Sequence, residues 1–311
     1  MTAAGQNLLE SQYKNLQGLE KDLNEARTPE PKTNALISLF LHHSLHNEPF
    51  NKKASIKYQQ QLEIYTHQTK NSELIAKALF SLIRPVVNEE KKKRIDRLYD
   101  FAKLHNLDFY KALAKTREAE YYTTYQPEKN KASQPLNEAF NLTKDMNDSL
   151  RTLMLADIGS KYIGMNNHLQ ALQLAFQANE LASKIRSWYL MRITNGLLSG
   201  IYNNLKNYNK AVEYNLKELE LLRLLGNIHF LALKHSNVAQ NFFLSGQPVL
   251  GNYHLTEAYR LADSLKGSKR LYNEITGSSI YALIFSENKE ILIEFLKKYR
   301  QHFFYFPDLS W

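Results

Sequence analysis

Two histidines in the stretch LHHSLH have the spacing of a pair of metal ligands. His42 and His46 stand four residues apart, so on a helix both imidazoles would project from one face. A metal site needs further ligands, and no third one is evident nearby in the sequence. The same spacing also suits ordinary surface or interface histidines, and we expect no bound metal.

Sequence motifs that carry catalysis are absent. The chain contains no Walker-type phosphate loop and no GxGxxG, HExxH or GxSxG motif. The segments GSKYIG and LKGSKR combine glycine with lysine but lack the context of a phosphate loop. The chain also has no cysteine, which removes disulfides, thiolate metal sites and cysteine nucleophiles. We therefore expect a protein that is not an enzyme and that uses no cofactor.

The positive charge of the chain is spread along its length. The net charge is +9, with 20 Lys and Arg against 16 Asp and Glu in residues 1–130, and 20 against 15 in residues 131–311. A nucleic-acid-binding surface usually concentrates its cations, so we expect no direct binding of nucleic acid. The one dense run, NEEKKKRIDR at 88–97, is either a solvated helix face or a phosphate-binding patch.

The sequence gives no sign of a membrane segment. No apolar run approaches the roughly 20 residues that span a bilayer, and the start MTAAGQNLLESQYKNLQ lacks the pattern of a signal peptide. A signal peptide removed before residue 1 would leave no trace. Together with the lack of cysteine, this favours a cytoplasmic protein that does not contact membranes.

The elements that would position any site are helices. Only 8 prolines and 11 glycines occur in 311 residues, and segments such as SELIAKALFSLIR and KKRIDRLYDFAKLH have the apolar spacing of amphipathic helices. Pro29 and Pro31 end the first helix because proline cannot continue one. The pattern predicts 15 helices.

A repeat of 40 residues runs through the second half of the chain. Small residues recur at this interval, and a bulky aromatic follows each of the first three by three residues. A small residue lets two helices approach closely, and the ring fills the space beside the contact. The aligned small residues are Gly159, Ser199, Ala239 and Ser279, and the aromatics are Tyr162, Tyr202 and Phe242.

This register resembles that of the tetratricopeptide repeat family. The family's two small positions, its aromatic and its late alanine are matched by Gly159, Ala171, Tyr162 and Ala178. Its tryptophan-like position and its proline are not matched, and its period is about 34 residues instead of 40. HEAT-type repeats have a longer period but lack the small–aromatic–small register.

The resemblance implies an all-α fold, a right-handed superhelical solenoid of antiparallel helix pairs. We expect three regions: degenerate helix hairpins at 1–106, the repeats at 107–300, and an aromatic C-terminal tail at 301–311. The tail would cap the last helix pair, or it would dock on a partner or lead into a further domain.

In this family, ligands bind the concave groove lined by the first helix of each pair. The cations that clamp peptide carboxylates in chaperone-binding members are absent here, whereas several carboxamides could pair with a peptide backbone. The residues implied at the groove are Arg117, Tyr121, Tyr125, Asp157, Ser160, Asn203, Asn204, Asn237, Gln240 and Phe243.

Two functions fit these features. One is a non-enzymatic scaffold that binds a protein or peptide in the groove. The other is a ligand-sensing module of a bacterial signalling or transcription-regulating system, similar to peptide-pheromone receptors, with its output domain outside this chain. Neither the partner nor the oligomeric state follows from the sequence, because groove chemistry varies on a common scaffold.

Overall fold

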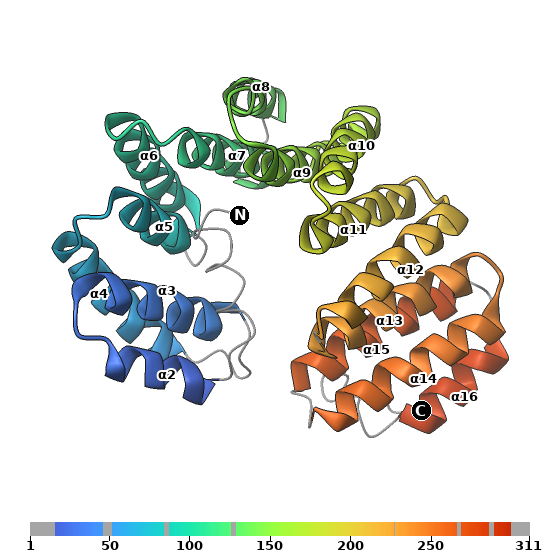
Figure 1. The fold of residues 1–311 in the computed structure, drawn as a ribbon. Helices are drawn as coiled ribbons and strands as arrows, with labels where there is room; N and C mark the ends of the chain where they lie inside the picture. Colours follow the sequence, from blue (N-terminus) through green and yellow to red (C-terminus); the bar gives the residue numbers. More distant parts are fainter. Residues whose placement is uncertain are drawn as a thin grey trace. The chain divides into compact units, whose positions relative to one another are not determined.

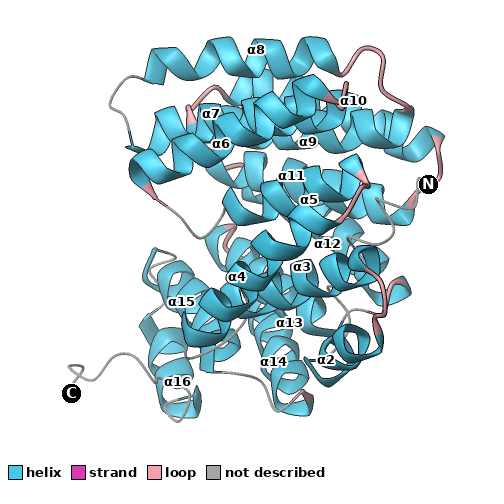
Figure 2. Cartoon of the chain, turned by 90° about the vertical axis from the view of Figure 1, so that its left-hand side faces the viewer, coloured by secondary structure: helices cyan, strands magenta, loops and turns pink. Residues whose placement is uncertain are grey.

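The computed structural model describes residues 16–45, 52–83, 87–125, 129–226, 228–265, 269–285 and 289–299. Within these ranges the chain forms 15 α-helices and one short 3-10 helix, and Figure 2 shows no strand among them. The predicted all-α class is therefore confirmed. The tail at 301–311 and His46 lie outside the described residues.

The chain divides into two compact units, Met1–Asn166 and Asn167–Trp311. The predicted boundary at residue 106 falls in the turn between two helices, α6 and α7, that contact each other inside the first unit. The first unit contains, in the blue to green part of Figure 1, α2 (Leu16–Glu25), α3 (Pro29–Leu45), α4 (Lys52–Gln68), α5 (Ser72–Ile83), α6 (Asn88–Leu104), α7 (Asp108–Tyr125), η1 (Lys129–Ala132), α8 (Ser133–Leu142) and α9 (Asp148–Gly164).

The second unit is a run of long helices joined by short turns. α10 contacts α11, α11 contacts α12, α12 contacts α13, and α13 contacts both α14 and α15. Their bounds are α10 (His168–Lys184), α11 (Trp188–Asn204), α12 (Tyr208–Leu224), α13 (Ile228–Leu244), α14 (Pro248–Ser264), α15 (Lys269–Phe285) and α16 (Lys289–Tyr299).

The turns of the second unit share one backbone geometry. Each of the four described turns, from α10 to α14, holds one residue with a φ between +51° and +75°, shortly after the last turn of a helix. Such a left-handed residue lets the following N–H reach back to a helix carbonyl, as Asn207 does to Tyr202 at 2.9 Å. The residues with positive φ are Arg186, Lys206, Gly226 and Gly246.

Two of the helices that follow, α11 and α12, begin at a polar capping side chain. Ser187 and Asn207 accept hydrogen bonds from the backbone N–H groups of Leu190 and Lys210, three residues along the chain. Each cap satisfies a backbone donor that the first helical turn leaves without a partner. Before α11 and α12, a left-handed residue followed by a cap therefore ends one helix and starts the next.

The small positions of the register are buried between helices. Ser199, Ala239 and Ser279 are at most 4% exposed, and Gly159 is buried as well. The second small position behaves in the same way, since Ala171 and Ala211 are fully buried. Small side chains at these sites therefore set the contacts between helices, as the sequence predicted.

Candidate ligand-binding faces

In the first unit, α7 and α9 meet through residues that stand 40 or 41 positions apart. Arg117 on α7 donates through Nη2 to both carboxylate oxygens of Asp157 on α9, at 2.9 and 3.0 Å. The Thr116 hydroxyl donates to the same carboxylate at 2.6 Å. Two of the predicted groove residues, Arg117 and Asp157, thus lie together, on one face shared by the two helices.

Glu120 joins this face to α6 and to the end of α9. Lys91 on α6 approaches one of its carboxylate oxygens at 3.0 Å, and Lys161 on α9 approaches the other at 2.8 Å. Arg117 also pairs with it, within α7. The "α7–α9 face" is defined here as Lys91, Arg117, Glu120, Asp157 and Lys161.

The charges of this face hold its carboxylates in the ionised form. Burial alone would raise the pKa of Glu120, but the charges of Arg117 and Lys161 outweigh it and lower that pKa well below the usual value. The pKa of Asp157 is lowered in the same way, against burial, by Arg117 and Lys161 and by the Thr116 hydrogen bond. Three cations thus face two carboxylates, which leaves one net positive charge.

Aromatic rings lie beside the α7–α9 face. The guanidinium carbon of Arg117 lies 5.5 Å from the ring centroid of Phe80 on α5, and Lys91 Nζ lies 5.4 Å from that of Tyr125. Tyr125 is half-buried, but Tyr121 is buried, with its ring 5.7 Å from that of Tyr125. Tyr121 therefore packs beside Tyr125 with little of its surface exposed, and its assignment to the groove stays a prediction.

The sequence-based choice of Tyr121 missed the charged residue next to it. Glu120 stands 40 residues before Ser160 and so occupies the register position assigned to the groove in the next repeat. Ser160 itself is half-buried, and its hydroxyl donates to the backbone carbonyl of Asp157 at 2.7 Å. A strict offset of 40 residues from Ser160 would have identified Glu120 as a groove residue. Lys91 and Lys161 do not stand at positions that the repeat assigns to the groove, so the sequence could not have identified them.

A second charged group lies in the second unit, among α11, α12 and α13. The carboxylate of Glu218 on α12 is 2.6 Å from Lys234 Nζ on α13 and 3.3 Å from Arg192 Nη1 on α11. The guanidinium of Arg192 lies 5.5 Å from the ring of Tyr189 and 5.9 Å from that of Phe230. Two cations face one carboxylate here, and sequence reasoning missed all three.

The predicted groove residues of the second unit differ in their exposure. Asn237 is exposed, Asn203 and Gln240 are half-buried, and Asn204 is exposed but donates to the Gly200 carbonyl of its own helix at 2.8 Å. Phe243 is only 2% exposed and packs in the core with Leu255 and Ala258, among others. Its ring is therefore enclosed by core side chains, and its assignment to the groove stays a prediction.

The described residues hold neither a metal-binding cluster nor a membrane-crossing helix. No group of three or more His, Cys, Asp or Glu side chains in these ranges could hold a metal ion. His42 packs edge-on against His43, and the ring of His43 stacks on Tyr58 at 5.3 Å. No helix in the same ranges combines the length and the apolar character needed to cross a membrane.

Comparisons with known proteins give a structural likeness alone. No family model matches the chain, and no curated protein matches it. Nineteen chains of solved structures do match. One of them, the crystal structure of the apo form of RapI, gives a TM-score of 0.49 at 12% sequence identity, over 92% of this chain and 85% of that chain. No family assignment follows from this likeness.

Proposed function

We propose that this chain is a non-enzymatic helical-repeat scaffold that binds a protein or peptide segment along the faces of alternate helices. The helices α9, α11 and α13 begin at Asp148, Trp188 and Ile228, which supports a long-helix form of the tetratricopeptide arrangement. The bond between Arg117 and Asp157 supports it as well, because residues at equivalent positions of two repeats there share one face.

The observation that carries the proposal is a set of carboxamides without intramolecular partners. Among the described residues, no hydrogen bond engages the side chains of Asn203 on α11 or of Asn237 and Gln240 on α13. Asn237 and Gln240 stand three residues apart, so they lie on one face of α13. Each carboxamide offers a donor and an acceptor, the pair that an extended peptide backbone also presents.

The experiment is a peptide selection followed by affinity measurements. Dodecapeptides are selected from a random phage-displayed library on the intact chain, and their affinities are measured by fluorescence polarisation. The double variant N203A/N237A should bind the selected peptides roughly 5- to 150-fold more weakly, because it loses two hydrogen bonds of about 0.5–1.5 kcal/mol each.

The matched control is Asn252→Ala, which removes an exposed carboxamide from α14. This variant should bind like the unchanged protein, and all three proteins should give the same helical circular dichroism. If the double variant and the unchanged protein bound with equal affinity, the peptides would not contact Asn203 of α11 or Asn237 of α13, and the proposed binding face would be wrong.

A further inference from the structure

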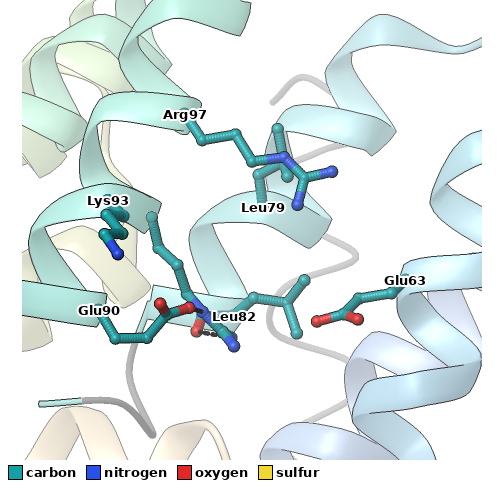
Figure 3. Close-up of a pocket in the computed structure, with 7 residues that line it drawn as sticks. Glu63, Leu79, Leu82, Glu90, Lys93 and Arg97 are labelled. Atoms are coloured by element: carbon teal, nitrogen blue, oxygen red, sulfur yellow. Dashed lines mark hydrogen bonds and ion pairs between the residues drawn. The ribbon is translucent and has the colours of Figure 1, made fainter.

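A small hollow opens among α4, α5 and α6 of the first unit (Figure 3). It has a volume of about 280 Å³, just below the range of roughly 300–1,000 Å³ in which ligand pockets fall. Leu79 and Leu82 on α5 give it apolar walls, and both are almost fully buried. The hollow is therefore suited to a compact ligand with a short apolar part.

Two of the charged residues at the hollow neutralise each other. Arg94 Nε donates to Glu90 at 2.9 Å, and Arg94 Nη1 donates to the carbonyl of Leu82 at 2.8 Å. The second bond satisfies a carbonyl in the last turn of α5, which has no helical partner. Arg94 and Glu90 thus have a structural role and leave little charge for a ligand.

The other three charged residues form no close ion pair within the described ranges, although the charge of Lys93 also helps to lower the pKa of Glu90. Lys93 and Arg97 stand four residues apart on one face of α6, and both are exposed. Glu63 projects from α4 on the opposite side of the hollow, and within the described residues its carboxylate accepts a hydrogen bond from Gln59 on its own helix at 3.3 Å. One wall thus carries two free cations and the other a free carboxylate.

We propose that this hollow binds a free acidic α-amino acid. Its two carboxylates would face Lys93 and Arg97, its ammonium group would face Glu63, and its methylene groups would lie on Leu79 and Leu82. A ligand with two negative groups and one positive group matches the three free charges one for one. The proposal also gives Lys93 and Arg97 of the basic run at 88–97 a specific role, in place of a solvated face or a phosphate patch, whereas Lys91 and Arg94 of that run are engaged by Glu120 and Glu90.

This site is independent of the proposed peptide binding, because it uses only α4, α5 and α6 and none of the carboxamides of α11 and α13. Failure of either proposal leaves the other standing.

The test measures binding of four probes to the intact chain by isothermal titration calorimetry. L-Glutamate should bind. The other three probes each lack part of it: glutarate has no ammonium group, L-leucine has no second carboxylate, and inorganic phosphate has neither an ammonium group nor an apolar part. Each of these three should bind roughly three- to tenfold more weakly than L-glutamate. Equal binding of glutarate or phosphate would show general attraction of anions and overturn the proposal, as would no heat from L-glutamate up to about 10 mM.

Variants assign the two walls separately. Glu63→Gln should weaken L-glutamate roughly three- to fivefold and leave glutarate unchanged, since only the ammonium contact is lost. Arg97→Ala should weaken both probes. The controls Glu89→Gln and Lys103→Ala change exposed charges of α6 that do not line the hollow, and they should change neither affinity. An equal effect of Glu63→Gln on both probes would also overturn the proposal.

Discussion

Gly251 occupies a place where the packing leaves no room for one more carbon atom. A Cβ added there would lie 2.7 Å from two atoms of the Phe243 ring. That ring is enclosed in the core of the second unit and cannot move aside freely. The glycine therefore lets α14 approach α13 closely, which is the role that the repeat register assigns to its small positions.

Replacing Gly251 with alanine should destabilise the second unit. Gly277 is the matched control, because it lies within α15 with nothing within 4 Å of an added Cβ. Gly277→Ala should gain roughly 0.5–1 kcal/mol from helix propensity, whereas Gly251→Ala also carries the cost of overpacking, about 1–3 kcal/mol. Urea unfolding should place the two variants on either side of the unchanged protein. Equal stability of the two variants would show that the Phe243 contact exerts no strain.

At the scale of elements, the buried carboxylate of Glu218 on α12 forms ion pairs with α11 and α13, at a repeat position where other copies have alanine. Glu218 stands at the register position of Ala178 and Ala258, and it is 5% exposed. Its carboxylate fits because Gly196 on α11 has no side chain, and a Cβ there would lie 2.7 Å from Glu218 Oε2. The larger residue on α12 is thus accommodated by a smaller one on α11.

This compensation predicts a change of sign in a double-mutant cycle. Gly196→Ala should destabilise the unchanged protein, because it displaces a carboxylate held by Lys234. Glu218→Ala alone should cost roughly 1–3 kcal/mol, since it leaves two cations without their carboxylate. In the Glu218→Ala background, Gly196→Ala should instead stabilise by about 0.5–1 kcal/mol.

The control for this cycle is Gly200→Ala on the same helix, where an added Cβ meets nothing within 4 Å. It should be mildly stabilising with or without Glu218. If the effect of Gly196→Ala had the same sign and size in both backgrounds, the two positions would not be coupled.

At the scale of the whole molecule, the strongest coupling of stability to acid lies in the second unit, although burial also lowers the pKa of His42 and His43 in the first unit. In the second unit His235 and His254 are buried with their Nδ1 atoms 3.1 Å apart. Burial lowers the pKa of both rings to about 4. The charge of Arg223 lowers both pKa values further, and His254 also lowers that of His235. Glu257 opposes the shift in both rings.

The carboxylates of the α7–α9 face in the first unit also have lowered pKa values. They stabilise the folded state above the usual carboxylate pKa of about 4 and lose this effect only below it. For the histidine pair, the unfolded chain binds protons from about pH 6.5 downward, whereas the folded chain does so only near pH 4. As the pH is lowered from about 6.5 to about 4, the free energy of unfolding of the second unit therefore decreases.

We expect acid to weaken the second unit first. Between pH 7 and pH 5 its free energy of unfolding should drop by on the order of 4 kcal/mol, about 2 kcal/mol from each ring, whereas that of the first unit should drop less, because burial shifts the pKa values of His42 and His43 less far. Hydrogen exchange corrected for intrinsic rates should show amides of α13 and α14 losing protection before those of α7 and α9. In His254→Phe the pH slope should be roughly halved, whereas His67→Gln, an exposed histidine of α4, should leave it unchanged. Simultaneous loss of protection in both units would contradict this assignment.

The sequence by itself determined the helices, the all-α class and the small positions between them. These follow from local chemistry, because apolar spacing, polar caps and the residues of the turns act within one or two helical turns. The burial of Ser199, Ala239 and Ser279 was therefore predictable from a regular offset.

Only the tertiary structure decided which side chains face one another from different helices. Tyr121 and Phe243 lie in the packed interior, whereas Glu120 lies on the α7–α9 face one position from Tyr121. A step of one residue turns a side chain by about 100° around a helix, so the face it occupies depends on how neighbouring helices pack. The pairing of Glu218 with Lys234 and Arg192, and the free charges around Leu79, follow from the same packing, because residues far apart in sequence meet only once the helices are in contact.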